Sequence, residues 1–134
     1  MTQRNQKANV AEELRRAAES LAAADLLAAN DYHKDAVSRL YYFVFHTVKA
    51  LLFSKGLEPK THEGVDRLLG LHFVKKGLIK PGLAHTFTRL MKYREEADYN
   101  PSYTFSAEDY RELKKDAQEL HHTITSFLSR KSLL

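Results

Sequence analysis

The sequence predicts an all-α protein, an up-down bundle of four main helices with one additional short helix. Three observations lead to this prediction: strong helix formers fill long stretches of the 134-residue chain, apolar side chains recur there every three or four residues, and only five glycines and three prolines occur. The breaks near residues 30–31, 56–59, 77–82 and 100–101 divide the chain into five segments with short connections. We therefore expect one domain over residues 1–134, with a core from about residue 9 to residue 130.

The first two segments predict long helices. In the first, about residues 9–29, small and apolar residues form a narrow seam that lets another helix approach closely: Val10, Leu14, Ala17, Leu21, Ala24 and Ala28. The second, residues 31–55, contains no glycine or proline, so helix is favoured over strand for its YYFVF run. Its apolar side chains spread around nearly all sides, which predicts a helix at the centre of the bundle or one covered by a partner.

Start and stop signals bound the other three helices. The third, shorter helix runs from Thr61 to Lys76, where the next residue is a glycine. The fourth runs from about Pro81 to Tyr99 and has its proline in the first turn, where the missing N–H costs little. The fifth begins at the sequence SAED, in which Ser106 is a suitable N-cap followed by acidic residues.

Composition narrows the class of protein. No cysteine is present, which excludes disulfides and thiolate metal sites, and the longest apolar run, LYYFVF, is far too short to span a membrane. We expect a soluble, cytoplasmic protein without membrane contact. The net charge of +4 favours anionic partners only weakly, because 17 acidic residues lie among the 21 basic ones. The chain has no HExxH motif, phosphate-binding glycine loop or GxSxG motif, so no metal or cofactor is expected.

The first group of candidate residues lies at the end of the fourth helix, in KYREEADYN. Continuing the apolar stripe of that helix by steps of four and three residues reaches Arg94, which therefore occupies a position where a core residue is expected. A buried arginine needs a partner, and Asp98, four residues later, can pair with it locally. Tyr99 follows directly. From the pattern alone, a structural ion pair is favoured over a binding site.

A second group lies along one side of the second helix. Arg39, Tyr42, His46 and Lys49 follow one another at spacings of three, four and three residues, so they form a polar stripe on an otherwise apolar helix. A lone histidine in such a place is more often structural than catalytic. If this stripe faces Arg94, the two groups would line one cationic cleft suited to a phosphate.

Four sequence blocks follow one another along the chain: DAVSRLYYFVFHTVKALL at 35–52, THEGV at 61–65, HFVKKGLI at 72–79 and YREEADY at 93–99. In this order they resemble the HEPN domain family (higher eukaryotes and prokaryotes nucleotide-binding), and in particular its small stand-alone prokaryotic branch. The resemblance implies a helical bundle that pairs into a homodimer with a cleft at the seam. It also implies nucleotide or RNA binding, and a separate minimal nucleotidyltransferase as the partner of a toxin–antitoxin-like pair.

Many members of the family are metal-independent ribonucleases with an R-x4-6-H motif, and here the sequence departs from the pattern. Arg94 matches the arginine, but Tyr99 stands five residues on, and no histidine occurs in the permitted window. Three hypotheses follow. The favoured one is a binding module whose phosphate ligands come from Arg39, Tyr42, His46, Arg94, Asp98 and Tyr99. The alternatives are a ribonuclease that uses Arg94 with Tyr99 or His46, and a structural dimerisation module without a ligand.

Overall fold

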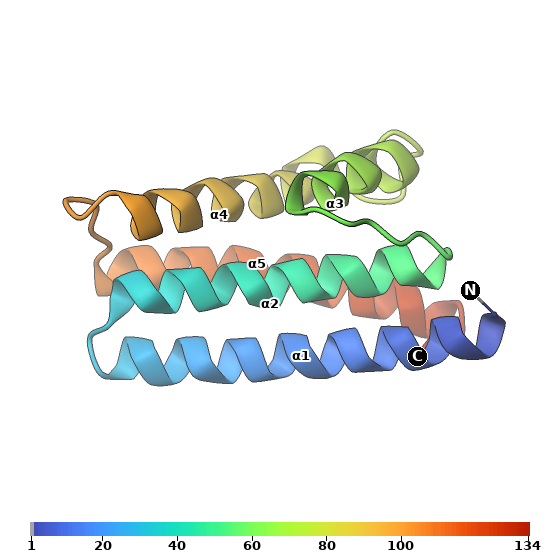
Figure 1. The fold of residues 1–134 in the computed structure, drawn as a ribbon, viewed down its shortest axis with the longest axis horizontal. Helices are drawn as coiled ribbons and strands as arrows, with labels where there is room; N and C mark the ends of the chain where they lie inside the picture. Colours follow the sequence, from blue (N-terminus) through green and yellow to red (C-terminus); the bar gives the residue numbers. More distant parts are fainter. Residues whose placement is uncertain (1) are drawn as a thin grey trace.

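The computed structural model describes residues 2–134, and every regular element in this range is helical. The described residues form five α-helices (Figure 1), and a short π-helical turn, η1, extends the third. Their bounds are α1 Gln3–Ala29, α2 His33–Ser54, α3 His62–Leu69, η1 Gly70–Val74, α4 Pro81–Tyr99 and α5 Ala107–Arg130. The predicted all-α class is confirmed, with four long helices and a short third one.

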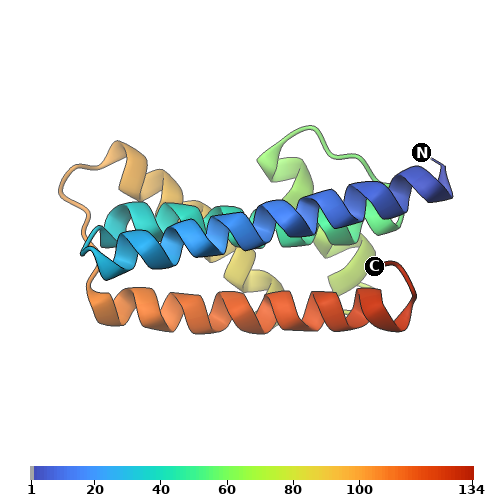
Figure 2. The same ribbon diagram turned by 90° about the horizontal axis from the view of Figure 1, so that it is seen from below.

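Helix α2 occupies the centre of the molecule, where it packs against α1, α3, α4 and α5. In Figure 1 it lies between α1 on one side and α4 with α3 on the other, and the four long helices alternate in direction along the chain. Figure 2 shows α5 running alongside α2, while α4 crosses behind them obliquely. This central position accounts for the apolar side chains on nearly all sides of α2.

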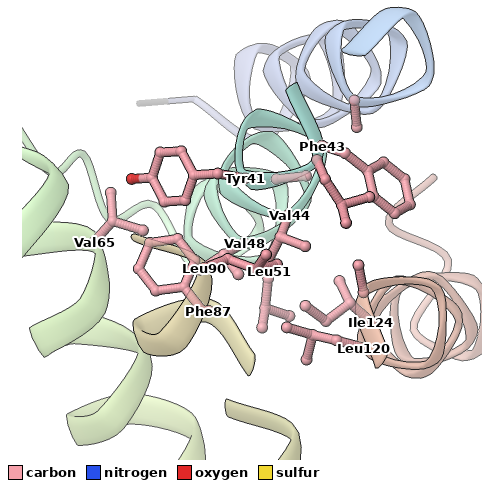
Figure 3. Packing of buried hydrophobic residues seen from close by; sticks show 14 of the residues in the cluster. Tyr41, Phe43, Val44, Val48, Leu51, Val65, Phe87, Leu90, Leu120 and Ile124 are labelled. Carbon is pink, nitrogen blue, oxygen red and sulfur yellow. The ribbon is translucent and has the colours of Figure 1, made fainter. Parts of the chain in front are cut away.

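The core is built around α2, and Figure 3 shows how its neighbours contribute. Val44, Val48 and Leu51 of α2 meet side chains of α4 and α5, all of them fully or almost fully buried: Phe87, Leu90, Leu120 and Ile124. Tyr41 leaves α2 on another side and lies beside Val65 of α3. The Tyr41 ring is buried, yet its hydroxyl is a polar group that needs a partner there.

Side-chain caps fix where the helices begin. The hydroxyl of Thr2 accepts a hydrogen bond from the Asn5 N–H at 3.1 Å, so α1 begins at Gln3. The sequence had predicted a later start, at about residue 9. Ser106 caps α5 as predicted: its hydroxyl accepts from the Asp109 N–H at 3.0 Å, and the Asp109 carboxylate accepts from the Ser106 N–H at 2.8 Å.

The third helix differs in detail from the prediction of one α-helix from Thr61 to Lys76. Its α-helical part ends at Leu69 and continues as the π-helical turn Gly70–Val74, closed by a bond from the Lys75 N–H to the Gly70 carbonyl at 2.9 Å. Glycine lowers the helix propensity at this point, and the wider turn keeps both Leu69 and Phe73 buried. None of the helices in residues 2–134 combines the length and apolar character needed to cross a bilayer.

Candidate anion-binding site

Arg94 lies against two tyrosine rings of the central helix. Its guanidinium carbon is 5.1 Å from the centroid of the Tyr41 ring and 5.9 Å from that of Tyr42. The Arg94 side chain is 18% exposed, and its Nε is buried without a hydrogen-bond partner in residues 2–134. Cation–π contacts of this kind stabilise an arginine by about 0.5–1 kcal/mol at exposed sites and by more when it is desolvated. Arg94 therefore points inward, as its place on the apolar stripe predicted, and its guanidinium lies beside two aromatic rings.

Asp98 is the one carboxylate of the described residues within 4.0 Å of the Arg94 guanidinium, but it holds this group only loosely. The distance from Arg94 Nη1 to Asp98 Oδ2 is 3.5 Å, at the outer limit of a hydrogen bond, and the Asp98 side chain is 44% exposed. An ion pair of this exposure contributes about 0–1 kcal/mol. The predicted local pair is therefore present, and it leaves most of the hydrogen-bonding capacity of the guanidinium unused.

Arg39 adds a second guanidinium to the same place. Its guanidinium carbon lies 5.2 Å from the centroid of the Tyr42 ring, so Tyr42 contacts one arginine from its own helix and another from α4. Arg39 is exposed and forms no ion pair within the described part of the chain. The structure thus brings together Arg39, Tyr42, Arg94 and Asp98, as the sequence suggested, and places two guanidinium groups at this surface.

The other half of the polar stripe has a different environment. His46 Nδ1 lies 2.6 Å from Oε2 of Glu13 in α1, and Lys49 Nζ lies 3.4 Å from the other carboxylate oxygen. The Glu13 side chain is 5% exposed, so this ion cluster is largely removed from water. Burial by itself raises the pKa of Glu13. The hydrogen bond from His46 and the charges of Lys49 and Arg16 outweigh burial and hold the pKa below its ordinary value.

Tyr41 finds its partner in His62, the first residue of α3. The Tyr41 hydroxyl lies 2.5 Å from His62 Nδ1, and the His62 ring stacks on Phe45 with centroids 4.4 Å apart. Burial raises the pKa of Tyr41 well above its ordinary value, although the charge of Arg94 opposes the shift. Burial, reinforced by the Arg94 charge, lowers the pKa of His62. Both groups are therefore neutral at neutral pH, and Arg94 remains the cation beside them.

Tyr99 does not join this cluster. Five residues separate it from Arg94, which places the two side chains about 140° apart around the helix. The Tyr99 side chain is 82% exposed and makes no hydrogen bond or ring contact with a described residue. In residues 2–134 no group of three or more histidine, aspartate or glutamate side chains converges as a metal site requires.

Two residues of the cluster were missed as site residues by the sequence reasoning. Helical spacing puts Tyr41 among the apolar residues of its helix, and His62 belongs to no metal-binding motif in the sequence. Two signals could have found them. A tyrosine inside an apolar run needs a hydrogen-bond partner, and His62 directly follows Thr61, whose hydroxyl caps α3.

Comparison with known proteins agrees with this architecture. The family model described as the HEPN domain matches residues 10–127, which is most of the chain. The chain belongs to the HEPN domain family. The resemblance inferred from the four sequence blocks is thereby confirmed, and the helical bundle is the fold of this family.

Three relatives of this HEPN chain cover different shares of it. A Methanocaldococcus jannaschii protein named as a putative toxin is 45% identical over 83 residues, which are 62% of this chain and 62% of that relative. A UPF0332 protein of Thermotoga maritima is 36% identical over 104 residues, 78% of this chain and 79% of the relative. A second M. jannaschii protein named as a putative toxin is 30% identical over 121 residues, 90% of this chain and 82% of the relative. The match with the first relative thus spans less than two thirds of its length.

Proposed function

We propose that this HEPN chain is a toxin-like module that binds the phosphate of a nucleotide or of RNA through Arg94 and Arg39. The observation that carries the proposal is the state of Arg94. Tyrosine rings hold it in place, and its nearest carboxylate is 3.5 Å away and half in solvent. A guanidinium that is held in position and only weakly paired can offer parallel N–H groups to phosphate oxygens.

The aromatic residues around the two arginines support a nucleic-acid ligand over a simple anion. Tyr42, Phe45 and His62 are only partly buried, and their rings lie within 6.3 Å of one another, centroid to centroid. Proteins that bind single-stranded nucleic acid combine a positive surface for the backbone with aromatic rings on which bases stack. Both components are present here within one patch.

A binding assay with a fluorescein-labelled single-stranded RNA of about ten nucleotides tests the proposal. We expect Arg94→Ala and Arg39→Ala each to weaken binding several-fold and to reduce the dependence of log K on log salt by about one unit. Arg94→Lys keeps the positive charge but loses the two parallel N–H donors of the guanidinium, so its binding should be intermediate between that of wild type and that of Arg94→Ala. Arg111→Ala on α5 is the matched control, because it removes one exposed positive charge elsewhere.

Arg39 is exposed, so its replacement leaves the fold intact and keeps the test valid even if Arg94→Ala destabilises the bundle. If both alanine variants bind the RNA as the Arg111→Ala control does, the proposal is wrong. A wild-type protein that does not bind the RNA, together with loss of cooperative melting in Arg94→Ala alone, would instead support the structural dimerisation module.

A second candidate function is metal-independent cleavage of RNA, and the Tyr41–His62 pair is the observation that favours it. Of the candidate bases, Tyr99 is exposed away from Arg94, and His46 is held by Glu13. His62, in contrast, contacts the hydroxyl of Tyr41, and Arg94 lies over the ring of the same tyrosine. In the tautomer whose Nδ1–H donates to the Tyr41 oxygen, Nε2 carries the free lone pair of a general base.

In such a reaction, His62 Nε2 takes the proton of a 2′-hydroxyl while the 2′-oxygen bonds to phosphorus. The bond from phosphorus to the 5′-oxygen breaks, water protonates that oxygen, and Arg94 neutralises the charge that develops on the phosphate. Incubation of RNA with EDTA present, followed by analysis for 2′,3′-cyclic phosphate ends, tests this. Cleavage should be lost in His62→Gln and retained in Tyr99→Phe; cleavage that survives His62→Gln refutes this assignment.

The relatives named as putative toxins support a role as the toxic half of a pair. We propose that the chain forms a homodimer and that a separate minimal nucleotidyltransferase is its neutralising partner. Expression of the wild-type chain alone should slow bacterial growth, Arg94→Ala should relieve the effect, and light scattering should give twice the mass of 15.4 kDa. A monomeric wild-type protein, or equal toxicity of the variant, contradicts this part of the proposal.

A further inference from the structure

A cavity of about 390 Å³ lies between α4 and α5, apart from the Arg94 cluster. It is formed by the second half of α4, the connection at residues 100–106 and the first half of α5, with the buried side chain of Leu113 contributing to its lining. In Figure 1 these three elements meet at one end of the bundle. None of the residues assigned to the anion-binding site lines this cavity.

Aromatic rings make one wall of the cavity. The Tyr93 and Phe105 rings meet edge to face with centroids 5.7 Å apart, and the Tyr103 ring is tilted against Phe105 at 5.2 Å. All three side chains are half-buried, so each ring retains accessible surface. Ring faces carry partial negative charge and attract cations.

Carboxylates of α5 also line the cavity. Asp109, Glu112 and Asp116 follow one another on α5 at spacings of three and four residues, which places them on one side of the helix. Arg89 is the one cationic residue in the lining, and its Nη2 donates to Asp116 at 2.6 Å. Three carboxylates therefore face one guanidinium in a protein whose net charge is +4.

Glu112 is the carboxylate that remains available. Asp109 accepts the N–H of Ser106 in the cap of α5, and Asp116 is occupied by Arg89. Glu112 forms no hydrogen bond or ion pair with another side chain of residues 2–134. This exposed carboxylate and the three aromatic rings line the same cavity, so its charge and the ring faces both attract a cation there.

We propose that this cavity binds a guanidinium group, held by Glu112 and stacked on the rings of Tyr103 and Phe105. A guanidinium is flat, so it can lie on an aromatic face while its N–H fork meets a carboxylate. The Arg89–Asp116 pair already joins one guanidinium to a carboxylate of α5 in this lining. This site goes beyond the proposed anion binding, because it selects a ligand of opposite charge with different residues.

Calorimetric titration of the full chain with N-butylguanidine, against its neutral isostere N-butylurea, tests the proposal. We expect the guanidine to bind and the urea not to bind. Glu112→Gln should weaken the binding by about tenfold or more, and Tyr103→Leu by about fivefold. Glu119→Gln, an exposed carboxylate of the same helix outside the cavity, is the matched control and should leave the affinity unchanged.

Proton NMR spectra should place the ligand, because methylenes beside a guanidinium that stacks on tyrosine shift upfield. Equal binding of guanidine and urea, no binding of either, or unchanged affinity in Glu112→Gln overturns the proposal. A peptide acetyl-Gly-Arg-Gly-amide that binds more tightly than N-butylguanidine indicates an arginine of another protein as the natural ligand, and equal affinity indicates a free small molecule. Arg94→Ala should leave guanidine binding intact, which separates this site from the proposed function.

Discussion

Replacing Glu13 by glutamine tests whether His46 is held by a buried ion cluster. The carboxylate is 5% exposed and contacts His46 at 2.6 Å and Lys49 at 3.4 Å, so it links α1 to the central helix. Glutamine has nearly the same shape and can still accept one hydrogen bond from His46. The substitution therefore removes the charge and leaves the packing almost unchanged.

The expected loss can be worked out from these contacts. A hydrogen bond to a charged acceptor contributes about 1.5–3 kcal/mol, and a neutral one about 0.5–1.5 kcal/mol. The variant loses the difference between these two values and also the attraction to Lys49. It no longer has to bury a charge, which offsets part of the loss, so the net destabilisation is about 1–2 kcal/mol. For a chain of 134 residues this corresponds to a Tm about 4–8 °C lower.

Urea denaturation followed by circular dichroism at several pH values measures this difference. The native pKa of Glu13 lies below its ordinary value of 4.5, so the unfolded chain binds the proton first. The stabilisation by Glu13 is therefore fully present above about 4.5 and is lost as the pH falls through the lowered native pKa. Wild type and Glu13→Gln should differ at pH 7 and converge in strong acid.

Glu12→Gln is the matched control, because it removes an exposed carboxylate from the same helix, and it should change stability much less. If Glu13→Gln is as stable as wild type at pH 7, or if the difference between them persists unchanged far below pH 4.5, the ion cluster does not hold His46. His46 would then again be a candidate for acid–base chemistry.

Three further predictions concern other parts of the bundle. Ser106→Ala removes the capping box of α5 and should lower the free energy of unfolding by about 1 kcal/mol in urea titrations, whereas an unchanged value would show that the cap contributes nothing. Tyr41→Phe removes the hydroxyl that His62 contacts and should cost about 0.5–1.5 kcal/mol in the same assay; a more stable variant contradicts this. Burial lowers the pKa of both His62 and His121 below 6.5, so the unfolded chain binds protons more readily and stability should fall as the pH drops below about 6.5. Thermal melts at pH 7.5 and 5.5 measure this fall, and replacing both histidines by glutamine should reduce it.

Most of the architecture could be predicted because it depends on local patterns. The fourth helix begins at Pro81 and ends at Tyr99 as expected, and the cap at Ser106 is present. The π-helical turn at Gly70–Val74 could not be predicted in this way. An α-helical and a π-helical turn share almost the same apolar spacing over so few residues, and the packing of Phe73 chooses between them.

The candidate site was predictable only in part. Helical periodicity placed Arg94 inward and put Arg39, Tyr42 and His46 on one side of their helix. It could not show that the residues of this stripe have different partners: Tyr42 contacts Arg94 of α4, whereas His46 contacts Glu13 of α1. Glu13 lies 33 residues from His46 in the sequence, so their contact depends on how α1 packs against α2.

The sequence by itself determined the all-α class and the inward position of Arg94, because both follow from local spacing and residue type. The order of four sequence blocks indicated the family. Only the tertiary structure decided which charges meet. It placed His62 on Tyr41 beside Arg94, turned Tyr99 to solvent and gathered an acidic, aromatic cavity between α4 and α5. Electrostatic and aromatic contacts act over a few ångströms, and such distances between helices are fixed only when the bundle packs.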